Sequence, residues 1–254
     1  MSGVLNIGNW IIGHSLDIGG WTLDISPMHI ILFDIDGTLL HSGGAGQAGI
    51  ERALELAFGV TAPTDGIPTA GRTDRGIGRD LIRFHGLEES DSTHAQLQEA
   101  YLRVLPSEIA NRKGVVYPGV RELLARLSTR NDVRLGLLTG NYREAAWLKL
   151  RHYDLAKHFA FGGYGDEHAD RDDVARQALA MAAEQHAPQT IEPDKLWVIG
   201  DTPADVRCAR AIGARAIAVA TGPYSAEELA KSEPDHLFDD FGNVESVLSL
   251  WPAL

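Results

Sequence analysis

The sequence predicts an α/β protein in which an all-helical module interrupts a parallel-sheet domain. The run HIILFD at 29–34 is apolar up to its final acid and contains β-branched residues, which is typical of a strand buried on both faces. Residues 44–111 carry only helical patterns, whereas strand and helix patterns alternate from 115 onward. A parallel sheet with crossover helices accounts for the alternation, so the helical residues form an insertion behind the first strand.

The individual elements follow from apolar spacing and from the Gly, Pro or acidic breaks between segments. Gly37 ends the first strand, and Pro118-Gly119 marks the return from the insertion to the sheet domain. We expect helices at 45–58, 73–86, 92–110, 119–129, 142–151, 172–186, 204–212 and near 243–250, and further strands at 133–140, near 158–163, at 195–201 and at 215–222. The predicted domains are an N-terminal extension at 1–27, a core at 28–42 and 115–254, and the inserted helical domain at 43–114.

Residues 1–27 contain two similar segments, LNIGNWII at 5–12 and LDIGGWTL at 16–23. Their short alternating pattern with Gly between indicates a small hairpin packed on the body of the protein. The alternative is that Met28 is the natural start and that the preceding residues are an extension. The sequence leaves both interpretations open.

The composition is that of a globular chain, because 254 residues of which 44% are hydrophobic can bury a substantial core. The net charge of -12 argues against a surface for nucleic acid or anionic membranes. No apolar run approaches the roughly 18 residues of a membrane span, and no signal peptide is recognisable. Cys208 is the sole cysteine, so no internal disulfide can form and a reducing cytoplasm is the expected location.

Two acids, Asp34 and Asp36, follow the first strand and project from the same face, because side chains alternate along a strand. Neighbouring carboxylates repel each other. Such a pair is stable when a cation neutralises it or when one acid holds a proton, and both situations are typical of active sites. The alternative is that Asp36-Gly37 only forms a turn.

Polar residues also follow two later strands. Thr139, Gly140 and Asn141 end one strand, and Asp201 ends the other, with Asp205 shortly behind it. Ligands of a parallel sheet bind beyond the carboxyl ends of its strands. We therefore expect these acids and the hydroxyl to converge on one edge.

The motifs DIDGTLL, LLTGN and VIGDTPAD resemble those of the haloacid dehalogenase superfamily, and specifically those of its phosphoglycolate phosphatase-like phosphatases. The resemblance covers about residues 28–235. It implies a Rossmann-like parallel-sheet core with the helical insertion as a cap domain. The segment GRTDRGI at 71–77 also resembles a cap segment of this group.

The resemblance implies that Asp34 is the nucleophile that forms an aspartyl-phosphate, and that Asp36 is the general acid and base. It also implies Mg²⁺, bound by the Asp34 side chain, the Asp36 backbone carbonyl and Asp201. For Asp205 two interpretations stay open, a part in the metal site or an acid that stabilises the first turn of its helix.

Thr139, Gly140 and Asn141 are expected to bind phosphate oxygens, although Asn141 alone would be read as a helix cap. The family uses a further basic residue, usually Lys, and none occurs between Lys157 and Lys195.

Arg171 is our candidate to replace it, and the alternative is an ion pair with Asp170, Asp172 or Asp173. In the cap, Arg72 is expected to bind a substrate carboxylate, or else to lie on the surface.

These observations predict a magnesium-dependent phosphomonoester hydrolase for a small phosphorylated metabolite, with phosphoglycolate as the leading candidate. A sugar phosphomutase shares the core acids and differs in its cap. A metal-independent haloacid dehalogenase does not need Asp36, and a non-catalytic binding protein would tolerate loss of Asp34, Asp36 and Asp201. We expect a monomer or homodimer without nucleic-acid or membrane partners.

Overall fold

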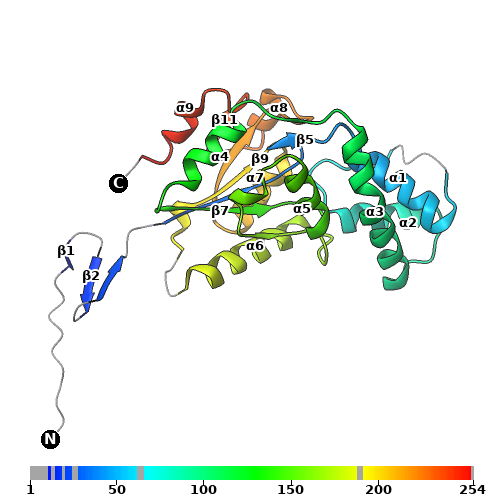
Figure 1. The fold of residues 1–254 in the computed structure, drawn as a ribbon, viewed down its shortest axis with the longest axis horizontal. Coiled ribbons are helices and arrows are strands. Elements are labelled where there is room, and N and C mark those ends of the chain that lie inside the picture. Colours follow the sequence, from blue (N-terminus) through cyan, green and yellow to red (C-terminus); the bar gives the residue numbers. More distant parts are fainter. Residues whose placement is uncertain are drawn as a thin grey trace, which may run out of the picture.

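The computed structural model describes residues 11–12, 15–18, 21–24, 28–61, 66–187 and 191–252. Within them the predicted α/β class is confirmed, with a six-stranded sheet between layers of helices (Figure 1). Neighbouring strands all pair in parallel, in the order β11-β10-β9-β4-β7-β8. The strands are β4 (His29–Phe33), β7 (Val133–Leu138), β8 (Phe161–Gly163), β9 (Leu196–Gly200), β10 (Arg215–Val219) and β11 (His236–Phe238).

Strand β4 lies inside the sheet, and its side chains enter both core layers. Ile31 and Phe33 pack with helices α4, α5 and α9, whereas Ile30 and Leu32 pack with α6, α7 and α8. Burial on both faces explains why this strand is apolar at every position. The helices of the core are α4 (Val120–Ser128), α5 (Arg143–His152), α6 (Arg171–His186), α7 (Pro203–Ala211), α8 (Ala226–Ala230) and α9 (Val244–Leu248), with short 3₁₀ helices η1 (Ala156–His158) and η2 (Pro193–Lys195).

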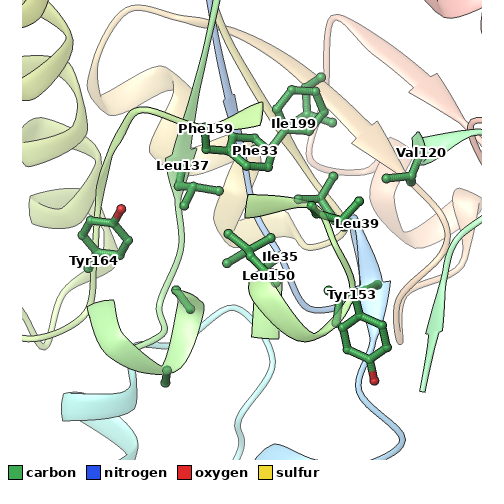
Figure 2. Close-up of a cluster of buried hydrophobic side chains, with 14 of the residues drawn as sticks. Phe33, Ile35, Leu39, Val120, Leu137, Leu150, Tyr153, Phe159, Tyr164 and Ile199 are labelled. Carbon is green, nitrogen blue, oxygen red and sulfur yellow. The ribbon is translucent and has the colours of Figure 1, made fainter. Parts of the chain in front are cut away.

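The apolar layer supports the carboxyl ends of the central strands. Figure 2 shows Phe33 of β4, Leu137 of β7 and Ile199 of β9 pointing into one cluster. Phe159 meets Phe33 edge to face, with ring centroids 6.0 Å apart. This packing fixes the strand ends, and therefore the polar residues that follow them.

Helices α1 (Ala45–Phe58), α2 (Asp74–Phe84) and α3 (Asp91–Asn111) form the insertion, which lies at one end of the sheet (Figure 1). Its connections to the core run through β5 (Leu40–His41) and β6 (Val115–Val116), which pair antiparallel. No sequence pattern predicts these strands, because two residues are too few to show alternation. The pairing lies next to the predicted limits of the insertion, 43–114, and those limits stay a proposal.

The N-terminal residues include strands β1 (Ile11–Ile12), β2 (Ser15–Ile18) and β3 (Trp21–Asp24), paired antiparallel in that order. In Figure 1 they lie away from the six-stranded sheet rather than packed on it. The predicted segment at 16–23 thus contributes to both β2 and β3, which pair with each other. Most of the segment at 5–12 lies outside the described residues.

Two further elements have no counterpart in the prediction. Helix α8 has only five residues and begins with a capping box between Ser225 and Glu228, and β11 has only three partly buried residues. Their brevity hides the periodicity on which sequence interpretation depends. Within the described residues, no helix has the length and apolar character needed to cross a membrane.

Candidate active site

The residues that follow β4, β7 and β9 meet at a cavity of about 530 Å³ between the sheet edge and the insertion. From the core, Asp34, Asp36, Thr139, Arg171 and Asp201 line this cavity. From the insertion, its wall includes Ile50, Ile77, Tyr101, Asp74 and Arg72. The side chains that follow these strands therefore converge on one edge of the sheet, as the sequence predicts.

Asp34 is buried at the end of β4. Its backbone N–H donates to the carbonyl of Ile199 in β9 over 2.9 Å, which fixes the residue against the neighbouring strand. Its Oδ1 lies 3.0 Å from Nη2 of Arg171. Burial raises the pKa of Asp34 to about 6, with Arg171 opposing the shift and Asp205 adding to it. This carboxylate therefore depends on neighbouring cations to stay ionised.

Arg171 begins helix α6 and is almost fully buried. Its Nη2 contacts Asp34 and, at 2.5 Å, Oδ1 of Asp205. Burial lowers the pKa of Arg171, but Asp205 and Asp34 outweigh it, so the pKa is raised and the guanidinium stays charged. A permanent cation thus stands beside the predicted nucleophile.

The alternative interpretation of Arg171 as a partner of nearby surface acids does not describe the structure. Asp172 pairs with Arg207 at 3.0 Å and Asp173 pairs with Arg176 at 2.5 Å. The side chain of Asp170 accepts a hydrogen bond from the N–H of Asp172 at the start of α6.

Asp201 follows β9 and is buried between two glycines. Its Oδ1 accepts a hydrogen bond from Thr38 Oγ1 at 2.9 Å. A Cβ at Gly37 or at Gly222 would overlap its carboxylate, so the glycines leave the space that the acid occupies. Burial raises the pKa of Asp201, and the neighbouring acids Asp205 and Asp34 raise it further.

Carboxylate oxygens of Asp34, Asp201 and Asp205 lie within 4.8 Å of one another, a grouping found among the described residues. Buried like charges with raised pKa values are the environment that a hard divalent cation relieves, and carboxylates are its preferred ligands. The site therefore suits a divalent metal ion. The side chain of Asp36 does not belong to this group. The predicted metal ligand at Asp36 is its backbone carbonyl and not its side chain.

Asp205 caps its helix, and its part in a metal site stays a prediction. Its Oδ2 accepts hydrogen bonds from the N–H and the hydroxyl of Thr202, at 3.0 and 2.7 Å, and closes a capping box at the start of α7. Its Oδ1 contacts Arg171, and the residue belongs to the acidic group around Asp34.

The turn after β7 presents a hydroxyl to the cavity. Thr139 Oγ1 accepts hydrogen bonds from Asn141 Nδ2 at 2.9 Å and from the Asn141 N–H at 3.3 Å. With both lone pairs used, its own O–H is left to donate, as a phosphate oxygen requires. Helix α5 is capped by Tyr142 rather than Asn141, so the Asn141 side chain serves the site.

The insertion is hydrogen-bonded to this turn through the segment that contains Arg72, Thr73 and Asp74. The N–H of Asp74 donates to the carbonyl of Gly140 at 2.7 Å, and Asp74 Oδ2 accepts from the N–H of Tyr142 at 2.8 Å. A Cβ at Gly140 would overlap the carbonyl oxygen of Arg72. Burial raises the pKa of Asp74 to about 6, and nearby Lys149 opposes the shift. No sequence pattern predicts this contact, because it joins segments far apart in the chain.

Arg72 lines the cavity, but its guanidinium already has partners. Its Nη2 lies 2.6 Å from Asp80 Oδ2 and 3.3 Å from the carbonyl of Gly76, while Nη1 reaches the carbonyl of Pro68 at 3.1 Å. A substrate carboxylate would compete with Asp80 for this cation. The substrate-binding role of Arg72 stays a prediction.

Lys149 is a cavity residue that the sequence interpretation missed. It lies on helix α5, is buried, and its Nζ is 2.5 Å from Asp36 Oδ2 and 2.6 Å from Asn141 Oδ1. One signal was available: Lys149 falls three and four residues after Ala146 and Ala145, on the apolar face of the helix. A lysine on such a face is unusual unless it has a partner.

Comparison with known proteins agrees with these motifs. The family model for haloacid dehalogenase-like hydrolases matches residues 28–213. The phosphoglycolate phosphatase of Rhodospirillum rubrum is 30% identical over 226 residues, which cover 84% of this chain and 88% of the relative. The phosphoglycolate phosphatase of Salmonella typhimurium is 25% identical over 245 residues, covering 87% and 92%.

Solved structures share the fold. A hydrolase from Pseudomonas syringae has a TM-score of 0.64 at 21% identity, covering 89% of this chain and 100% of its own. CbbY from Rhodobacter sphaeroides, in complex with phosphate, has a TM-score of 0.62 at 22% identity, covering 85% and 96%. Since the family model spans most of the chain, including the motifs at Asp34, Thr139 and Asp201, the chain belongs to the haloacid dehalogenase-like hydrolases, as one of their phosphatases.

Proposed function

We propose that the chain hydrolyses the phosphomonoester phosphoglycolate, with Mg²⁺, through an aspartyl-phosphate on Asp34. The observation that carries the proposal is the contact between the Asp34 carboxylate and Arg171, beside Asp201 and Asp205. It brings the proposed nucleophile, a fixed cation and a group of acids suited to a metal ion together at one end of the cavity. The names of the curated relatives support phosphoglycolate as the substrate.

In the first step of the proposed mechanism, an Asp34 oxygen attacks phosphorus and the bond from phosphorus to the ester oxygen breaks. Asp36 donates its proton to that oxygen, so glycolate leaves with a neutral hydroxyl group in place of the ester oxygen. Arg171, the Thr139 hydroxyl and the N–H of Gly140 bind the phosphoryl oxygens as their charge changes. The N–H of Asn141 would join them only by leaving Thr139 Oγ1.

In the second step, a water attacks the phosphorus of the aspartyl-phosphate. Asp36, now ionised, takes the proton of that water, and Asp34 is released as a carboxylate together with inorganic phosphate. Mg²⁺, held by Asp34, Asp201, Asp205 and the backbone carbonyl of Asp36, would supply positive charge that offsets the repulsion between the nucleophile and the phosphate. Because Asp36 gives a proton in the first step and takes one in the second, it ends each cycle in the protonation state in which it began.

Arg72 is proposed to discriminate among substrates, because every candidate substrate carries the same phosphate. Exchange of its Asp80 partner for the glycolate carboxylate would tie binding to a planar, bidentate contact. The Arg72→Ala variant should therefore raise KM for phosphoglycolate strongly and change KM for p-nitrophenyl phosphate little, with Arg72→Lys intermediate. Equal effects on both substrates would assign Arg72 to the structure of the insertion.

A panel of phosphorylated metabolites, assayed for phosphate release with and without Mg²⁺, tests the proposal. We expect magnesium-dependent release that is fastest with phosphoglycolate. A hexose 1-phosphate converted to its 6-phosphate without phosphate release would instead indicate a phosphomutase. We also propose a cytoplasmic location, which cell fractionation tests, and a monomer or homodimer, which light scattering tests.

A further inference from the structure

Lys149 brings a second buried cation to the cavity, on the side of Asp36 rather than of Asp34. Its side chain is 3% exposed, whereas the side chain of its partner Asp36 is 39% exposed. Asp36 thus keeps contact with solvent, whereas Lys149 gives up its hydration to reach Asp36. Burial of an ammonium group is costly and persists where its hydrogen bonds are satisfied. The geometry therefore indicates that Lys149 serves to hold Asp36 in place.

Lys149 also determines which way Asn141 points. Its ammonium can only donate, so the atom it contacts at 2.6 Å must be the Asn141 carbonyl oxygen. The amide nitrogen of Asn141 then faces the other way, where it donates to Asp36 Oδ2 at 2.8 Å and to Thr139 Oγ1 at 2.9 Å. Lys149 and Asp36 therefore orient the amide together, since the ammonium requires its oxygen and the carboxylate requires its nitrogen.

The three side chains form a closed triangle of hydrogen bonds. Lys149 and Asn141 both donate to the same oxygen of Asp36, Oδ2, and Lys149 donates to Asn141. The other oxygen of Asp36 has no donor among the described side chains. The triangle thus fixes one carboxylate oxygen and leaves the other to exchange a proton with the substrate.

We propose that Lys149 is a positioning residue for this phosphatase, which aims the free oxygen of Asp36 at the leaving group by holding Oδ2 and by fixing the Asn141 amide. The inference rests on the proposed role of Asp36 as the acid. It assigns the lysine to leaving-group departure and not to attack on phosphorus, which is the task of Asp34 and Arg171.

The dependence of rate on the leaving group tests this assignment. The Lys149→Met variant keeps the length of the side chain and removes its charge. We expect kcat/KM to fall by about 10² for phenyl phosphate, whose leaving group needs a proton, and by less than about threefold for p-nitrophenyl phosphate, whose leaving group does not. A side chain with a purely structural role would lower both rates by the same factor, and equal losses would overturn the proposal.

A double-mutant cycle asks whether Lys149 acts through Asp36. The single variants Asp36→Asn and Lys149→Met should each slow phenyl phosphate hydrolysis, and the double variant should be no more than about twofold slower than Asp36→Asn. Multiplied losses in the double variant would show that Lys149 acts independently, which overturns the inference. Full activity of Asp36→Asn would instead overturn the proposed acid, so the two failures are distinguishable.

The control for these measurements is Arg151→Met. Arg151 lies two residues farther along α5 and pairs with Glu144 at the surface, with both side chains more than half exposed. We expect no change in rate on either substrate. Lys149→Arg, which keeps the charge and both donors, should recover part of the rate on phenyl phosphate, and melting temperatures confirm that each variant folds. If Lys149→Met does not fold, Lys149→Gln supplies the same comparison of substrates.

Discussion

Two carboxylates that are only two residues apart, Asp34 and Asp36, each have a buried cation as partner, but they differ in exposure. In the pair of Asp34 and Arg171 both side chains are buried, at 7% and 4% exposed. In the pair of Asp36 and Lys149 only the cation is buried. Both acids follow the end of β4 at Phe33 and line the cavity, but their surroundings differ.

The difference shows how one motif can supply two chemical roles. Asp34 lies among further acids and touches a guanidinium that cannot lose its proton, so it is equipped to remain an anion beside cations. Asp36 retains contact with solvent on one side and is held by Lys149 on the other. A pair of acids in such different environments can divide into a nucleophile and an acid–base catalyst, the roles proposed for Asp34 and Asp36.

The largest expected effect comes from removal of the buried acid. Asp34→Asn keeps the shape of the side chain but removes the attacking anion, so phosphate release should fall by about 10³ or more. Release from p-nitrophenyl phosphate by the purified variant measures the loss. Asp173→Asn, an exposed acid on α6, is the matched control and should retain full activity. Near-normal turnover by Asp34→Asn would remove the distinction between the two acids.

Removal of the cation of the buried pair should come next. Arg171→Met leaves Asp34 and Asp205 without their guanidinium partner, and we expect kcat to fall by about 10² to 10³. Arg171→Lys should recover part of this loss, because it restores the charge but not the fork of donors. Arg176→Met on the exposed face of α6 controls for loss of an arginine. If Arg171→Met lost only thermal stability, the residue would be a structural partner of Asp205.

Metal binding should sharpen the comparison, because it concerns the buried acids. Burial raises the pKa of Asp34 to about 6, so between pH 3.8 and about 6 the metal-free folded state binds more protons than the unfolded state and loses stability as pH rises. A cation binds the ionised acids, so Mg²⁺ should raise Tm more at about pH 7.5 than at about pH 5. Asp201→Ala should abolish the shift. An unchanged shift in that variant would place the metal elsewhere.

The smallest expected effect concerns Asp74, a partly buried acid of the insertion. Burial raises its pKa to about 6, so its stabilising protonated form is lost as pH rises through about 6. Asp74→Asn keeps an acceptor for the N–H of Tyr142 and removes the charge. With Mg²⁺ present throughout, Tm of the variant should decline less between about pH 5 and pH 7.5, by a few degrees or on the order of 1 kcal/mol. Parallel Tm curves would show that Asp74 is ionised at no cost.

Much of the core could be predicted from sequence, because its strands are continuous apolar runs and its site residues follow directly after them. The meeting of Asp34, Thr139 and Asp201 needs only the rule that parallel strands end at one edge. The placement of Arg171 beside Asp34 also agrees with its predicted role, although the resemblance to a family and not the local pattern suggested it.

Other features depend on packing between segments that the sequence does not align. Lys149 reaches Asp36 only because α5 docks on the sheet with its alanines inward, and the lysine shares their face. Asp74 meets Tyr142 only because the insertion folds onto the core. Short elements such as β5, β6 and β11 are stabilised by their neighbours and carry too few residues to show a period.

Gly140 has no side chain, so a substitution there can disturb the contact between the insertion and the core without changing an acid or base of the site. The carbonyl of Arg72 rests where a Cβ of residue 140 would lie, so even a methyl group there is a wedge between insertion and core. Gly140→Ala should therefore hold the two apart while every acid and base of the site keeps its identity. Such a variant would show whether phosphate binding needs the contact between Arg72 and Gly140.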